Sequence, residues 1–166
     1  SPKLFNLDTE TLLKKASRQK TLDSHRCLIP LTGVYVWKPF AKKKSIPYFI
    51  SPSDKNPLSI AGIWEEKDDF DEKANHTFIM ITKSSDEGMT PYQENMPLCL
   101  SKKNAASWMN KKTPIKEIKE IIKAQFTLPL IAHPVSPLIS NLSIDSPSLI
   151  KHSQPSDQYG NYTLFQ

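Results

Sequence analysis

The chain contains little glycine, little cysteine and no long apolar run, and each shortage excludes a class of protein. Only four of its 166 residues are glycine, and none of them belongs to a phosphate-binding loop pattern. Two cysteines, Cys27 and Cys99, are too few for a disulfide framework. No apolar run approaches the roughly 20 residues that span a bilayer. We therefore expect a cytoplasmic protein with no membrane segment, in which both cysteines are buried free thiols.

Metal and cofactor signals are also missing from the sequence. The four histidines lack metal-ligand spacing and lie near no Cys/His cluster, which argues against a zinc site. The acidic run from Glu65 to Glu72 lacks the glycine and the oxygen spacing of a calcium loop. There is no Gly-x-Ser-x-Gly nucleophile elbow. We predict no metal ion and no cofactor.

A length of 166 residues fits a single domain that can bury a substantial core. We assign residues 1–150 to this domain and residues 151–166 to a C-terminal tail packed on it. The chain begins at Ser1 rather than at Met. We expect that upstream residues were removed or lie on another piece, which would leave a sheet edge that needs a complementing segment or a second copy.

The net charge of +5 hides a segregated pattern along the chain. Residues 1–45 carry ten Lys or Arg against three acids, whereas residues 46–100 carry four against ten. Residues 101–166 are basic again, with eight against four. Basic ends beside an acidic middle suit a surface for a polyanion, although solvated faces around one acidic loop explain the charges equally well.

Periodicity and capping signals predict an α+β fold. Asp8 and Ser101 are expected to cap helices that extend to about Ser17 and Asn110. Thr113 is expected to cap a third helix, whose isoleucines recur with helical spacing. Six or seven short strands and these three helices indicate a partly closed β-barrel or curved sheet with flanking helices. The expected strands cover residues 26–29, 34–38, 46–51, 58–65, 76–82, 96–100 and 130–136.

Seven short motifs occur in an order that resembles the SRAP family, the SOS-response-associated peptidases that process abasic sites in DNA. Single motifs are weak signals, but seven in order are fairly specific, and they span the chain from Asn6 to about Leu149. The motifs are Asn6-Leu-Asp-Thr-Glu10, Arg26-Cys-Leu-Ile-Pro30, Gly33-Val-Tyr-Val-Trp37, Pro47-Tyr-Phe-Ile50, Ala61-Gly-Ile-Trp64, Tyr92-Gln-Glu-Asn-Met-Pro97 and His133-Pro-Val-Ser136.

The resemblance implies a chemistry as well as a fold. In this family, an N-terminal cysteine condenses through its amine and thiol with the aldehyde of an abasic sugar, and a thiazolidine DNA–protein crosslink results. An Asn, a Glu and a His assist this reaction. Of these three, the chain retains the asparagine as Asn6, but it has Val36 at the glutamate position and Gln93 at the histidine position. The cysteine segment is absent from the sequence, and Cys27 and Cys99 lack the required α-amine.

The two substitutions remove proton transfer from the implied catalytic positions. A valine side chain cannot exchange a proton, and a glutamine cannot do so near neutral pH. Asp8 also replaces a phosphate-contacting arginine of the family, which should weaken a backbone contact there. We therefore expect single-stranded DNA to remain a partner, including DNA with abasic sites, while crosslinking is reduced or lost.

Six residues are carried over as nucleic-acid-binding candidates. Trp37 fits base stacking or core packing, and Trp64 has the same two interpretations. The basic run around Lys42 fits either a groove edge or a solvated loop. The candidates are Asn6, Arg18, Trp37, Lys42, Lys43 and Thr82.

Three functions remain open at this stage. The first is a single-stranded DNA-binding protein with impaired crosslinking. The second is an active crosslinking enzyme whose cysteine comes from an upstream segment or a separate chain. The third is a vestigial fold that serves protein interaction.

Overall fold

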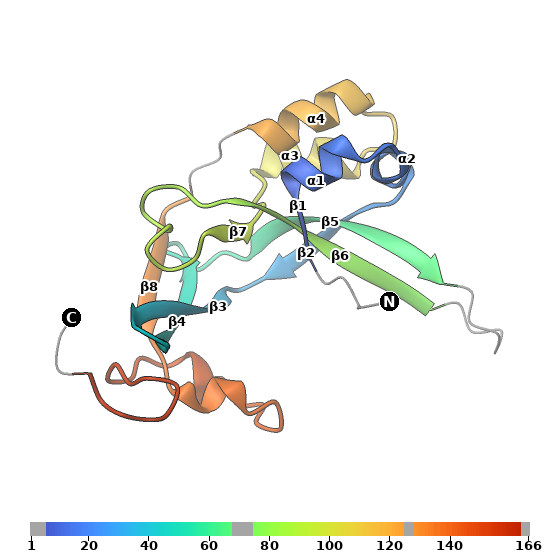
Figure 1. Cartoon of the computed structure of the whole chain (residues 1–166). Helices are drawn as coiled ribbons and strands as arrows, with labels where there is room; N and C mark the ends of the chain where they lie inside the picture. The colour runs from blue at the N-terminus through green and yellow to red at the C-terminus, as the bar shows by residue number, and fades with distance from the viewer. Residues whose placement is uncertain (1–5, 68–74, 125–127, 164–166) are drawn as a thin grey trace. The chain divides into compact units, whose positions relative to one another are not determined.

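The computed structural model describes residues 6–67, 75–124 and 128–163 (Figure 1). These residues form an α+β fold, as the sequence predicts, and they divide into two compact units. None of the helices in the described residues has the length and apolar character that a membrane crossing requires. Unit 1 contains the described parts of Ser1–Leu31, Leu58–Ser84 and Asn95–Leu128. Unit 2 contains the described parts of Thr32–Pro57, Ser85–Glu94 and Pro129–Gln166.

Unit 1 contains a five-stranded sheet in the order β1-β6-β5-β2, in which β7 also pairs with β6. The sequence does not predict β1, because three residues are too few to display a strand period. The edge strand β2 runs through Pro30, which the sequence predicts as a strand end; an edge position tolerates the missing N–H. The strands are β1 (Asn6–Asp8), β2 (Arg26–Leu31), β5 (Leu58–Lys67), β6 (Asn75–Ser84) and β7 (Asn95–Pro97).

Four helices lie on one side of this sheet (Figure 1). Asp8 accepts a hydrogen bond of 2.8 Å from the Thr11 amide, so the predicted cap of the first helix is confirmed. Ser101 caps α3 through the Asn104 amide at 3.2 Å, also as predicted. The sequence does not predict α2, since that segment has no apolar stripe. The helices are α1 (Thr9–Lys14), α2 (Ala16–Ser24), α3 (Lys102–Met109) and α4 (Ile115–Lys123).

The prediction that Thr113 caps α4 through its side chain is wrong. The helix begins at Ile115 after Pro114, with no side-chain cap. The hydroxyl of Thr113 is instead buried and donates to the carbonyl oxygen of Ser107 at 2.7 Å. The threonine therefore ties the connection between the two helices back to α3.

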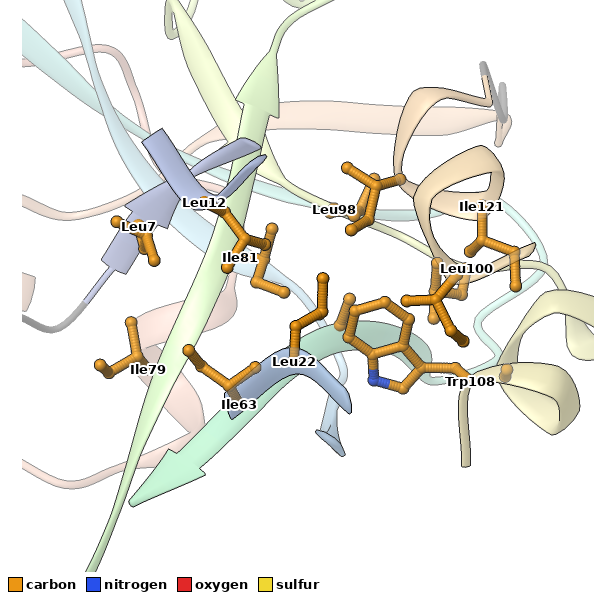
Figure 2. Close-up of a cluster of buried hydrophobic side chains, with 14 residues drawn as sticks. Leu7, Leu12, Leu22, Ile63, Ile79, Ile81, Leu98, Leu100, Trp108 and Ile121 are labelled. Atoms are coloured by element: carbon orange, nitrogen blue, oxygen red, sulfur yellow. The ribbon is translucent and has the colours of Figure 1, made fainter. Parts of the chain in front are cut away.

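The core of unit 1 lies between the sheet and the helices (Figure 2). Ile63 and Ile81 point from the sheet towards Leu12 and Leu22 of the first two helices. The predicted isoleucine stripe of α4 is confirmed, because Ile118, Ile121 and Ile122 are buried in the same cluster. Trp108 is fully buried, and its indole donates to the carbonyl oxygen of Cys27 at 2.9 Å.

Arg26, at the start of β2, caps the C-terminal ends of two helices. Its Nε donates to the carbonyl oxygen of Trp108 at 2.6 Å, and Nη2 donates to that of Asn110 at 2.9 Å. Its Nη1 donates to the carbonyl oxygens of Leu22 and Asp23 at 2.8 and 2.7 Å. A cation therefore satisfies the last carbonyls of both α2 and α3, where the helix dipole also favours positive charge.

Unit 2 contains a three-stranded sheet in the order β3-β4-β8. Ala41 pairs with Lys44, so Lys42 and Lys43 form the two-residue turn of a hairpin, and Lys43 has a φ of 61°. Both sheets of the described residues are open. The elements of unit 2 are β3 (Val34–Ala41), β4 (Lys44–Pro52), β8 (Leu130–Pro134) and two short 3-10 helices, η1 (Pro137–Ser140) and η2 (Pro147–Ile150).

The C-terminal segment holds the β3–β4 hairpin at its turn. The side-chain amide of Gln158 donates to the Lys43 carbonyl at 2.8 Å and accepts from the Ser45 amide at 2.8 Å. Next to it, the buried Asp157 carboxylate pairs with Lys44 at 3.2 Å. Within the predicted tail, Tyr162 is largely exposed, and Leu164 and Phe165 lie outside the described residues.

The ionisation of Asp157 makes this attachment sensitive to acid. Burial by itself would raise the pKa of Asp157, but hydrogen bonds from Asn161, Lys44 and Tyr159 outweigh burial and lower that pKa to about 2. Because this value lies below the usual 3.8, the carboxylate stabilises the folded tail above about pH 4, and the stabilisation is lost as pH falls towards about 2.

We therefore expect the Asn161 backbone amide, which donates to Asp157 at 2.9 Å, to titrate in this acid window when followed by NMR. An Asp157→Asn variant should show no such titration, since it removes the proton-binding group. An Asn161 signal that stays constant between about pH 4 and pH 2 in the unmodified protein would contradict this assignment.

Candidate nucleic-acid interface

In unit 1, the structure brings two of the candidate residues onto one face of the sheet. Asn6 of β1 pairs with Met80, and Asp8 pairs with Thr82 of β6. Paired residues of adjacent strands share a face, and so do residues two apart, so Asn6 and Thr82 face the same way. Asn6 is exposed, and its amide can both donate and accept hydrogen bonds.

Asp8 lies on the same face, and it already has a structural role. The hydrogen bond from the Thr11 amide lowers the pKa of Asp8, so this cap carries a negative charge at neutral pH. Asp8, which stands at the arginine position of the family, therefore also caps the start of α1. A phosphate that approached Asn6 and Thr82 would meet this charge.

Arg18, the third candidate of unit 1, is not free. It lies in α2, is half-buried, and forms an ion pair with Glu65 of β5. A phosphate could use this guanidinium only by competing with the carboxylate. The assignment of Arg18 to nucleic-acid binding stays a prediction.

In unit 2, Val36 and Gln93 occupy very different surroundings. Val36 is only 6% exposed in β3, where it pairs with Tyr48 of β4. Gln93 is exposed and lies in the turn that leads towards β7. The main chain of Gln93 is fixed there, because its amide donates to the Met89 carbonyl at 3.0 Å and its carbonyl accepts from the Ser85 hydroxyl at 2.5 Å. Neither side chain can act as an acid or a base near neutral pH.

A cation and two phenols border these positions, and sequence reasoning missed this cluster. Lys38 Nζ lies 4.6 Å from the ring centroid of Tyr92 and 5.6 Å from that of Tyr48. The two rings meet edge to face with centroids 5.1 Å apart. Burial, followed by the charge of Tyr92, raises the pKa of Tyr48, so its hydroxyl stays protonated and can donate. The only sequence signal was that each residue lies in or beside one of the seven motifs.

Trp37, Lys42 and Lys43 complete the candidates of unit 2. Trp37 is half-buried and pairs with Pro47, an arrangement that suits packing on one side of the ring. Lys42 and Lys43 are exposed at the hairpin turn, whereas the next lysine, Lys44, is paired with Asp157. The basic run therefore contains two available cations rather than three.

The two thiols are poor nucleophiles in this structure. Burial raises the pKa of Cys99 to about 11 and also raises the pKa of Cys27. Both cysteines are free, as expected, and both are partly buried. Because the thiolate is the reactive species, neither side chain supplies one near neutral pH. Among the described residues, no group of three or more potential ligands could hold a metal ion.

The comparison with known proteins establishes the class to which this fold and these motifs belong. The family model described as SOS response associated peptidase (SRAP) matches residues 1–142. The chain therefore belongs to the SRAP family, and the expectation from the motifs is confirmed.

Individual relatives agree with this placement. The chain is 31% identical to the abasic site processing protein YoqW of Bacillus subtilis, over 90% of this chain and 67% of YoqW. It is 28% identical to the abasic site processing protein YedK of Escherichia coli, over 90% of this chain and 68% of YedK. A crystal structure of a protein from Bacteroides thetaiotaomicron has the same fold, with a TM-score of 0.79 and 24% identity over 89% of this chain.

The chain spans 67% of the length of YoqW and 65% of the length of the Bacteroides protein. The family and the fold are thus shown, and the relatives YoqW and YedK are named abasic site processing proteins.

Proposed function

We propose that this chain binds single-stranded DNA as an abasic-site-recognising SRAP protein and that its crosslinking activity is impaired. The observation that carries this proposal lies in unit 2. There, the glutamate position of the family is a buried valine, while Lys38, Lys42 and Lys43 remain unpaired with any carboxylate of the described residues. The three lysines can attract a polyanion, whereas the valine cannot transfer a proton.

The energetic argument separates binding from chemistry. Lysines that neutralise phosphates release counterions, and this term supplies most of the non-specific affinity for nucleic acids. It does not depend on Val36 or Gln93. Positioned acid–base catalysis typically contributes roughly 10²–10⁴-fold to a rate, so the loss of both groups affects crosslinking far more than binding.

An active crosslinking enzyme is the main alternative. The exposed Asn6, on the same face as Thr82, supports it, because an amide there could orient an aldehyde or a sugar hydroxyl. Such an enzyme would need a cysteine with a free α-amine from an upstream segment or a separate chain. A vestigial fold that serves protein interaction is the third candidate. Replacing Lys42 and Lys43 tests it, because these changes should have no effect on such a fold's activity.

Replacing Lys42 with Gln and Lys43 with Asn should weaken the binding of labelled single-stranded DNA. Asn is chosen at position 43 because the φ of 61° there disfavours most side chains. Each lost phosphate contact lowers the slope of log affinity against log salt by about 0.7, so two contacts lower it by roughly 1.4. At about 0.1 M salt this corresponds to a loss of roughly 25-fold in affinity.

Lys151→Gln is the matched control, because Lys151 is also an exposed lysine of unit 2. It should leave the salt slope unchanged. If the unmodified chain shows no salt-sensitive binding at low ionic strength, the proposed function is wrong. If it binds and the double variant keeps the full slope, the hairpin has no part in the interface.

A further inference from the structure

Three side chains of unit 2 lie together: Lys38 of β3, Tyr48 of β4 and Tyr92 in the turn before β7. The lysine nitrogen lies over both rings, at 4.6 and 5.6 Å from their centroids. The negative faces of the rings therefore attract the cation, and no oxygen acceptor of the described residues occupies its N–H donors.

Lys38 differs from the lysines of the described residues whose ammonium has a carboxylate, carbonyl or amide oxygen as its partner. Lys44 pairs with Asp157, Lys83 donates to two carbonyls at the end of α4, and Lys119 donates to Gln19. Lys38 has no such partner. No buried side-chain nitrogen or oxygen of the described residues lacks a hydrogen bond, so the unbonded Lys38 Nζ must reach solvent. The same argument places both phenolic hydroxyls in contact with solvent.

The cluster borders both positions at which the chain departs from its family. Lys38 follows Val36 by two residues, so the two side chains share a face of β3. Tyr48 is the cross-strand partner of Val36, and Tyr92 immediately precedes Gln93. A cation and two phenol rings therefore lie beside the positions at which the chain lacks the glutamate and the histidine of its family.

We propose that Lys38 binds a backbone phosphate of single-stranded DNA and that Tyr92 is the residue that positions it. This inference rests on the proposed function. It names one DNA contact, which lies beside Val36 and Gln93. A phosphate oxygen is the complement of this cation, because the ring contacts leave its N–H groups without an oxygen acceptor among the described residues. Preorganisation by the rings reduces the entropy that a long lysine side chain loses on binding.

The test compares four variants in the binding of a labelled oligothymidylate over a range of salt concentrations. Lys38→Met should lower the salt slope by about 0.7 and the affinity by roughly 5-fold at about 0.1 M salt. Tyr92→Leu should weaken binding by about 2–5-fold with the slope unchanged, because the lysine remains but is no longer held. Tyr92→Phe keeps the ring and should restore the affinity. The double variant K38M/Y92L should bind no more weakly than K38M alone.

Lys151→Met is the control for the loss of a lysine elsewhere in unit 2 and should leave the slope unchanged. Thermal unfolding of each variant checks that the fold is intact, which is expected because Lys38 makes no hydrogen bond within the described residues. If K38M keeps the slope of the unmodified chain, the phosphate contact is wrong although the proposed function stands. If Y92F loses as much affinity as Y92L, the ring does not position the lysine. If the unmodified chain fails to bind at all, the proposed function and this inference both fail.

Discussion

The full natural gene product carrying both Val36→Glu and Gln93→His is expected to crosslink single-stranded DNA with an abasic site much faster than the unmodified protein. Each positioned acid or base typically contributes roughly 10²–10⁴-fold, so the pair should accelerate the reaction by at least about 10²-fold. The structure adds a reason for position 36, which is only 6% exposed. Burial raises the pKa of a carboxyl group and favours a form that can donate a proton.

The control for this experiment is Val36→Gln combined with Gln93→His. Gln matches the size and polarity of Glu but cannot transfer a proton, so this pair should recover only part of the acceleration. Covalent product is measured on a denaturing gel over time. A folded Glu/His double variant with no acceleration would show that the family roles of positions 36 and 93 do not apply to this chain.

Replacing Arg26 with Met is expected to cause a large loss of stability. Arg26 is buried and satisfies four carbonyl oxygens at the ends of α2 and α3, including those of Leu22 and Trp108. Met has a similar length but donates no hydrogen bond. The bonds to Trp108 and Leu22 are buried, and each buried carbonyl left without a partner costs roughly 1–3 kcal/mol, so the free energy of unfolding should fall by about 2–6 kcal/mol.

Arg18→Met is the comparison, because Arg18 pairs with Glu65 at a partly exposed site. Its loss should change the free energy of unfolding by about 1 kcal/mol or less. Urea unfolding of both variants measures the difference. If Arg26→Met lies within about 1 kcal/mol of the unmodified protein, the carbonyl network does not hold the helix ends in solution.

Sequence reasoning succeeded where the signal is local. Asp8 and Ser101 cap their helices because a side chain bonds an amide three residues away, and this pattern is visible in the chain. The isoleucine stripe of α4 was equally readable, since its spacing alone defines a buried face. The seven motifs identified the family from order and spacing, without any knowledge of contacts.

The elements that sequence reasoning missed depend on contacts between distant residues. Arg26 meets carbonyls 82 and 84 residues away, and Thr113 bonds Ser107 rather than its own helix. Helix α2 has no apolar stripe, and the buried Leu22 packs it into the core of unit 1. For the candidate site, residue types could be assigned to positions, but the pairing of Arg18 with Glu65 could not be foreseen.

The measurement that tests the account most directly uses the natural gene product and single-stranded DNA with an abasic site, in native and denaturing gels beside its Val36→Glu/Gln93→His variant. The account predicts a salt-sensitive shifted band in the native gel. It also predicts that the covalent band in the denaturing gel forms at least about 10²-fold more slowly than with that variant. A covalent band that forms as fast as that of the variant, or the absence of a native complex at low salt, would contradict it.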